Sequence, residues 1–230
     1  EFLPLDDEIT ERKSISEGLT RPELSVLISY VKGDLKEELN DSTLPDDAHL
    51  KDEIDVVFPK QITGKYKQAL HSHRLRREII ATQVANDMVN HMGINFVNRL
   101  QQSTGASEQA IALSYIVARD VFKLEQLWQA IESLDYTISS ELQMNMMNAL
   151  MSLMRRACRW LIRNRRNEAQ VINNMERFSS GIETISKNLS NYLSGATLEQ
   201  WQNNFQRLSD EGVPNTLATT IAGANFLYAS

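Results

Sequence analysis

The sequence predicts an all-α fold, a multi-helix bundle built either as one continuous body or as two helical subdomains. Only 9 glycines and 5 prolines interrupt the 230 residues, fewer than a protein of many short strands and tight turns requires. Apolar residues recur at three- and four-residue steps, and no segment shows the alternation of a half-buried strand. With 42% hydrophobic residues, the chain can bury a substantial core.

The first helix is expected to begin at Thr20, a plausible N-cap that Pro22 and Glu23 follow as first-turn residue and capping-box partner. Residues 1–18 are therefore expected to form a linker or docking arm, and residues 19–166 the helical body. One face of this helix is apolar: Leu24, Leu27, Ile28, Val31, Leu35 and Leu39.

A long helix follows two breaks in the chain. Residues 44–47, LPDD, end the first helix and start a short one that stops near Phe58, and Pro59 opens another that leads into the long helix at about Ala69. Gly93 is suited to the left-handed position after the long helix. The apolar residues of this helix share one face: Leu75, Ile79, Ile80, Val84, Met88 and Met92.

Further helices are expected after Gly93. A short one covers residues 94–102, and Ser107 caps the next, which a turn near Phe122 divides. Ser140 and Gln143 form a capping box before a helix of about six turns, at 3.6 residues per turn.

The last group of helices, residues 167–230, is either separate from the body or continuous with it. Thr197 and Gln200 suggest a third capping box, and residues 212–214, GVP, precede a final helix that extends to Leu227. The clearest seam of the chain lies here and predicts packing against other helices of the chain: Val171, Met175, Phe178, Ile182, Ile185, Leu189 and Tyr192.

Composition limits the environment and the partners. The lone Cys158 excludes an internal disulfide, and neither a membrane span nor a signal peptide is present, so we expect a soluble cytoplasmic protein. The chain starts without methionine in an acidic segment, which suggests a piece of a longer polypeptide. The net charge of −6 combines acidic ends with a basic middle that either binds nucleic acid or compensates the ends.

Catalytic, metal and nucleotide sites are not expected. His71 and His73 are two residues apart, whereas a helical metal pair needs a spacing of three or four, and no glycine-rich phosphate loop occurs. Cys158 has no base nearby in sequence, so a packed thiol is the default interpretation.

Two arginine clusters are the candidate contact surfaces. The cluster of Arg74, Arg76 and Arg77 opens the long helix, where cations are unfavourable unless a partner offsets the helix dipole. The acidic candidates for that partner are Asp46, Asp47, Asp52, Glu53 and Asp55.

The second cluster is a stripe with steps of four, four and three residues: Arg155, Arg159, Arg163 and Arg166. A solvated helix end is the favoured interpretation of this stripe, followed by a protein contact and then by nucleic acid.

Three blocks carry a resemblance to a known family: residues 1–4 (EFLP), residues 18–27 (GLTRPELSVL) and residues 73–93 (HRLRREIIATQVANDMVNHMG). In this order they resemble the C-terminal region of the large bacterial NAD-specific glutamate dehydrogenases. The resemblance is specific over about residues 1–166, and after that only helical character supports it.

The resemblance implies a parent enzyme that converts L-glutamate and NAD into 2-oxoglutarate and ammonia. Its catalytic and NAD-binding residues lie upstream of this chain, so no catalytic, cofactor or metal residue is assigned here and the chain itself is expected to hold no cofactor. The chain would be a non-catalytic helical domain with a scaffold, assembly or regulatory role. It would pack on the upstream catalytic domain and support a homo-oligomer. The alternative is a free-standing helical module that binds nucleic acid or protein.

Overall fold

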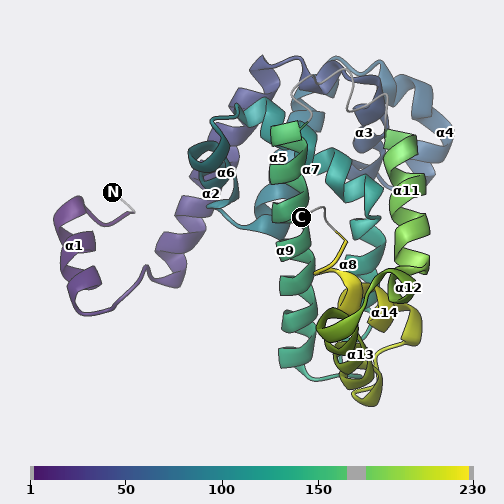
Figure 1. Ribbon diagram of the computed structural model, residues 1–230. Coiled ribbons are helices and arrows are strands. Elements are labelled where there is room, and N and C mark those ends of the chain that lie inside the picture. Colours follow the sequence, from purple (N-terminus) through teal and green to yellow (C-terminus); the bar gives the residue numbers. More distant parts are fainter. Residues whose placement is uncertain (1–2, 165–174, 228–230) are drawn as a thin grey trace. The chain divides into compact units, whose positions relative to one another are not determined.

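The structure is a computed structural model of the chain and describes residues 3–164 and 175–227. These residues form helices and connecting turns, and none of them lies in a strand, which confirms the predicted all-α class. The chain divides into two compact units, residues 1–99 and residues 100–230 (Figure 1). In the described ranges, no helix is both long and apolar enough to cross a membrane.

The first unit is built around two helices, α2 and α5. In chain order it contains α1 (Asp6–Ser14), α2 (Arg21–Asp41), the short 3-10 helices η1 (Leu44–Asp46) and η2 (Ala48–Asp52), α3 (Glu53–Val57), α4 (Lys60–His71) and α5 (Arg76–Met92). Helix α5 packs on α2, η1 and α3, and α3 also packs on α4. Helix α6 (Phe96–Thr104) leads from this unit into the second.

Helices α2 and α5 run in opposite directions. Near the start of α5, Arg77 bonds to the carbonyl of Asn40 at the end of α2, and near the end of α5, Asn90 accepts a hydrogen bond from Lys32 at 2.7 Å. The core of the unit is the apolar face of α5, namely Ile80, Ala81, Val84, Ala85, Met88, Val89 and Met92. The predicted stripe of the long helix is thus the buried face, apart from Leu75 and Ile79 at its start.

The second unit is centred on α7, which packs on α8, α9 and α11. It contains α7 (Glu108–Val121), α8 (Leu124–Glu132), α9 (Ser140–Asn164), α11 (Met175–Lys187), α12 (Leu189–Tyr192), α13 (Gly195–Asp210) and α14 (Asn215–Gly223). Ten of the fourteen residues of α7 are buried, among them Tyr115, so this helix is the centre of the core. Helices α13 and α14 pack on each other, and α14 also contacts α9.

Several predicted helix starts are confirmed. The Thr20 hydroxyl accepts a hydrogen bond from the Glu23 amide, and the Glu23 carboxylate accepts one from the Thr20 amide, as the capping box requires. Ser107 caps α7. The predicted turn near Phe122 is present because Lys123, with φ of 53°, takes the left-handed conformation before α8.

Other predicted boundaries are wrong. The Ser139 hydroxyl caps α9, not Ser140, and Gln143 instead donates its side-chain amide to the Ile131 carbonyl. Helix α13 starts two residues before Thr197, whose hydroxyl donates to the Ser194 carbonyl. A serine or threonine hydroxyl can hydrogen-bond to several neighbouring backbone groups. The sequence alone therefore does not determine at which residue the helix begins.

Three further differences concern the extent of helices. Helix α4 ends at His71 and a turn separates it from α5, so the long helix does not begin at Ala69. The predicted seam is divided between α11 and α12, and its first residue, Val171, lies outside the described residues. The last helix stops at Gly223, before the buried Leu227. Residues 1–18, expected to be a linker or docking arm, include helix α1, which is compatible with a docking arm. The predicted limit at residues 166 and 167 falls within residues 165–174, outside the described residues.

Candidate functional site

The first arginine cluster lies at the N-terminus of α5, as predicted. Arg76 and Arg77 are the first two residues of the helix, and Arg74 lies exposed in the turn before it. Among the described residues, Asp46 of η1 is their acidic partner: Arg76 donates to its Oδ1 at 3.1 Å and Arg77 forms an ion pair with its Oδ2. The carboxylate offsets two cations that would otherwise face the positive end of the helix dipole.

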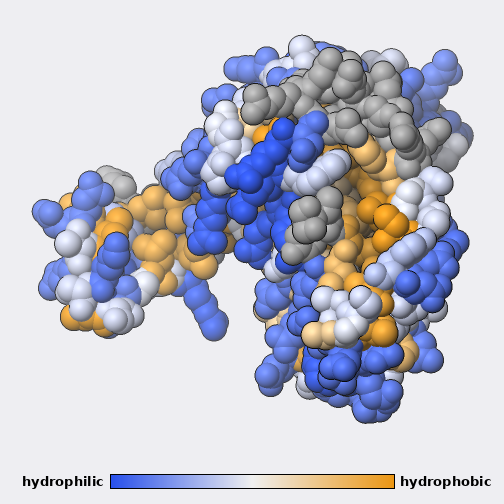
Figure 2. Space-filling view, viewed as in Figure 1, coloured by the Kyte–Doolittle hydropathy of each residue, from blue (hydrophilic) through white to orange (hydrophobic). Residues whose placement is uncertain are grey.

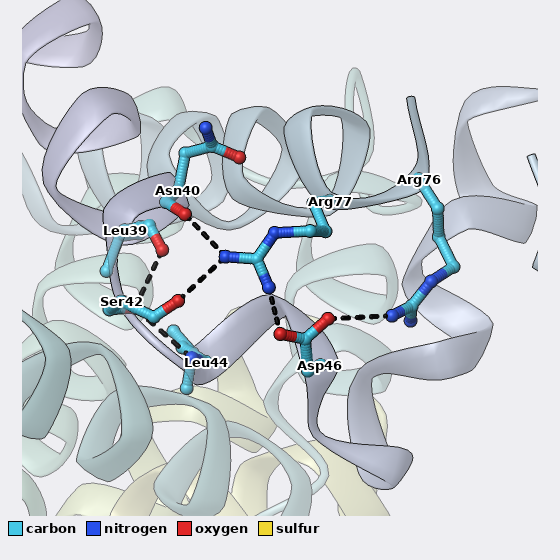
Figure 3. A network of polar contacts seen from close by, with 7 residues as sticks. All are labelled: Leu39, Asn40, Ser42, Leu44, Asp46, Arg76 and Arg77. Atoms are coloured by element: carbon cyan, nitrogen blue, oxygen red, sulfur yellow. Dashed lines mark hydrogen bonds and ion pairs between the residues drawn. The ribbon is translucent and has the colours of Figure 1, made fainter. Parts of the chain in front are cut away.

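Arg77 also closes the C-terminus of α2 (Figure 3). One guanidinium nitrogen donates to the carbonyl oxygens of Asn40 at 2.7 Å and Ser42 at 3.0 Å. The last carbonyls of a helix have no partner within the helix, so an arginine fork supplies the missing donors. The Ser42 hydroxyl extends the network by donating to the Leu39 carbonyl and accepting from the Leu44 amide. This cluster therefore joins α2, η1 and α5.

A second polar cluster lies between η2, α3 and α4 and was not predicted. Lys67 forms ion pairs with Asp52 at 2.9 Å and Asp55 at 3.2 Å, and these contacts lower the pKa of Asp52 and raise that of Lys67. His71 Nε2 lies 3.5 Å and 3.4 Å from the same two carboxylates. The sequence places Asp52 and Asp55 three residues apart, which suggests that the two carboxylates lie close together. It does not show that α4 folds back beside them.

The same cluster offers the one group of three candidate metal ligands among the described residues, Asp52, Asp55 and His71, whose ligand atoms lie within 4.8 Å of one another. The Lys67 ammonium already contacts both carboxylates, so a cation would have to displace it. The arrangement thus has the chemistry of an ion-pair cluster that holds α4 to the segment before it.

The second arginine cluster lies along the last turns of α9. Arg155 donates its Nε to the Met151 carbonyl one turn earlier, at 3.2 Å, while Arg159 and Arg163 are exposed. Arg166 lies outside the described residues. Arg156 belongs to the same arginine-rich segment but not to the predicted stripe, and its guanidinium donates to the Ala224 carbonyl and the Asn225 side chain at 3.2 Å and 3.1 Å. It therefore links α9 to the segment after α14.

The second unit contains an apolar cavity of about 320 Å³. Side chains of α7, α9 and α11 line it together with Phe226 and Leu227. Two of the lining residues, Trp160 and Phe178, contact edge to face with their ring centroids 6.3 Å apart. Figure 2 shows apolar residues gathered on this unit between α9 and α11. The lining is almost entirely carbon, so the cavity provides apolar contact and no acid-base chemistry.

Cys158 is fully buried on α9, and burial raises the pKa of its thiol to about 12. The thiolate is the nucleophilic form of cysteine, so this side chain is inert at neutral pH. This result agrees with the interpretation of a packed thiol.

Comparison with known proteins gives consistent matches along the chain. Residues 16–230 match the family described as "Glutamate dehydrogenase, C-terminal". The NAD-specific glutamate dehydrogenase of Pseudomonas aeruginosa is 47% identical over 228 residues, which make up 99% of this chain and 14% of that protein. The enzyme of the same name from Halomonas elongata is 44% identical over 100% of the chain and 14% of its own length.

A more distant relative, the NAD-specific glutamate dehydrogenase of Mycobacterium tuberculosis, is 28% identical over 100% of the chain and 14% of its own length. The chain thus corresponds to the C-terminal 14% of these long relatives. The resemblance stated from the sequence is confirmed, and it extends beyond residue 166.

Proposed function

This chain belongs to the glutamate dehydrogenase C-terminal family, and from that premise we propose that it is a non-catalytic helical scaffold within an NAD-dependent glutamate dehydrogenase. The parent enzyme would oxidise L-glutamate with NAD to 2-oxoglutarate and ammonia, using residues and a cofactor site upstream of this chain. The domain would pack on that catalytic part and support assembly of a homo-oligomer.

The observation that carries the proposal is that the arginines at the N-terminus of α5 bond to groups of the same chain. The arginine pair of the first cluster, which could have bound a substrate carboxylate, bonds instead to Asp46 and to two main-chain carbonyls of the same chain. Such a cluster stabilises helix packing. The thiol of Cys158 is likewise buried and protonated at neutral pH.

The exposed arginines of the two clusters are therefore the residues proposed to contact other parts of the enzyme. Among the side chains that the structure describes, Arg74, Arg159 and Arg163 have no hydrogen-bond or ion-pair partner. Arginine is enriched in protein interfaces because its planar fork binds carboxylates and carbonyls in pairs. We keep Arg76, Arg77 and Arg155 as proposed contact residues, although each already bonds within the chain.

The proposal is tested by removing residues 1–230 from the full-length enzyme. We expect the remaining polypeptide to bind NAD but to form smaller assemblies, measured by light scattering coupled to size-exclusion chromatography. A truncated enzyme that keeps its assembly size, its turnover and its thermal stability would overturn the proposed role.

The contact surface is tested by a paired charge reversal, Arg159→Glu with Arg163→Glu, in the full-length enzyme. The matched control is Lys51→Glu with Lys60→Glu, because both lysines are exposed and the change of charge is the same. We expect only the arginine variant to reduce the assembly size. A charge reversal at Arg76 and Arg77 should also loosen assembly, but it removes bonds inside the first unit as well.

A further inference from the structure

Helix α2 is longer than the helix on which it packs. The α5 partner of Lys32 is Asn90, and α5 ends two residues later at Met92. Residues 21–29 of α2 therefore extend past the end of α5 by roughly 14 Å, at 1.5 Å per residue. In Figure 1 the start of α2 and helix α1 extend away from the rest of the first unit.

The apolar stripe of α2 nevertheless continues along its whole length. Leu35 and Leu39, in the second half, are buried at 5% and 0% exposure. None of the four stripe residues in the first half is buried: Leu24, Leu27, Ile28 and Val31. The sequence thus repeats the core-facing pattern over turns whose apolar side chains stay half-buried or, at Leu24, exposed at 39%.

Helix α1 does not bury this half of the stripe. It has no buried residue, and its neighbourhood adds to the exposed apolar surface, with Leu5 at 74% and Ile15 at 61% exposure. Figure 2 shows apolar residues over α1 and the first half of α2. We call residues 3–31 the N-terminal arm.

The arm has a defined conformation before any partner binds. Arg12 of α1 forms a two-pronged ion pair with Glu23 of α2 at 2.8 Å and 3.0 Å, and Glu23 also belongs to the Thr20 capping box. A preformed apolar surface loses little conformational entropy on docking, so it is suited to a permanent contact.

We infer that the N-terminal arm docks through the stripe of Leu24, Leu27, Ile28 and Val31 onto the upstream part of the same polypeptide. This inference rests on the proposed function. The chain matches the C-terminal 14% of its relatives, so in those proteins most of the polypeptide precedes the region that corresponds to the arm. The arm carries Asp6, Asp7 and Glu8 at its start, so the docking surface should have a basic rim.

The inference is tested in the full-length enzyme with Leu24→Asp and Val31→Asp. The matched control is Ser29→Asp with Tyr30→Asp, because both residues are exposed on the same helix but lie off the stripe, Tyr30 about 100° from Val31. We expect the stripe variant to raise the rate of proteolytic release of the domain about tenfold or more, and the control to leave it unchanged. Equal rates in both variants and the unmodified enzyme would overturn the inference.

A second measurement identifies the occupant without destabilising the arm. A benzophenone amino acid at position 24 should cross-link to a peptide upstream of the domain within one polypeptide, whereas one at position 30 should not. Cross-links to the arm of a second copy, or no cross-link at position 24, would overturn the inference.

The two proposals fail separately. If removal of residues 1–230 disrupts assembly but neither arm measurement gives the expected result, the scaffold role stands and the arm is not its surface. If removal changes nothing, the scaffold role itself fails.

Discussion

Arg77 shows how a single side chain can hold two helices together. Its guanidinium bonds to the carbonyls of Asn40 and Ser42 and to the carboxylate of Asp46, so three segments depend on one residue. The same group lies where the dipole of α5 disfavours a cation, and Asp46 offsets that cost.

We expect Arg77→Ala to lower the free energy of unfolding by about 1–3 kcal/mol, because it leaves two carbonyls at the end of α2 without donors. Arg77→Lys should recover only part of this loss, since an ammonium cannot reproduce the fork. Denaturant unfolding followed by circular dichroism measures both. The control Arg74→Ala should stay within about 0.5 kcal/mol of the unmodified chain. Equal losses of unfolding free energy for Arg74→Ala and Arg77→Ala would contradict the role of Arg77 in bonding to the end of α2.

Glu23 gives the arm a defined dependence on pH. The hydrogen bond from Arg12, followed by those from the Thr20 amide and hydroxyl, lowers its pKa to about 2 from an ordinary value of 4.5. Because the folded-state pKa is the lower one, the carboxylate stabilises the arm above pH 4.5, and this contribution is lost as the pH falls from 4.5 towards 2.

A carboxyl titration by nuclear magnetic resonance tests this assignment. We expect Arg12→Ala to raise the pKa of Glu23 towards 4.5, while Lys13→Ala, one residue away and exposed, should leave it low. An unchanged pKa after Arg12→Ala would show that the capping box alone holds the carboxylate.

Helix α5 depends on the residue that ends it. Gly93 has φ of 81° and ψ of 164°, a region that is essentially restricted to glycine. Gly93→Ala should therefore lower the free energy of unfolding by about 1–3 kcal/mol. Gly33→Ala inside α2, where an added Cβ meets no atom within 4 Å, should raise it by up to about 1 kcal/mol. Thermal unfolding measures both variants. If the two substitutions shift the midpoint temperature in the same direction, the prediction is contradicted.

The sequence predicted elements best where the signal is local. Thr20 and Ser107 begin helices because each hydroxyl bonds to a backbone amide three residues later. The choice of Asp46 among five acidic candidates depends on how the chain folds back at η1, so it could not be made from sequence. Apolar spacing likewise identified the stripe of α2 but not that only residues of its second half would be fully buried.

The whole molecule has a net charge of −6, with its basic residues concentrated between positions 61 and 166. Part of this excess is compensated inside the first unit, where Lys67, Arg76 and Arg77 pair with Asp46, Asp52 and Asp55.

We therefore expect no binding of duplex DNA by the 230-residue chain at low salt in a fluorescence anisotropy titration. Binding that weakens steeply as salt rises would instead support a nucleic-acid module, because each displaced counterion steepens the dependence on salt. Binding that does not depend on the salt concentration would contradict the expected absence of binding and would not support a nucleic-acid module.

Under the proposed function, the apolar stripe in the first half of α2 bears on the order in which the parent polypeptide is synthesised and folds. A ribosome synthesises a C-terminal domain last, and upstream domains fold while synthesis continues. With the arm docked as inferred, its receptor is already folded when Leu24 and Val31 leave the exit tunnel, so the nascent stripe is covered soon after it emerges. When the 230-residue chain is expressed without the rest of the proposed parent polypeptide, the stripe has no receptor. The chain should then self-associate more as its concentration rises.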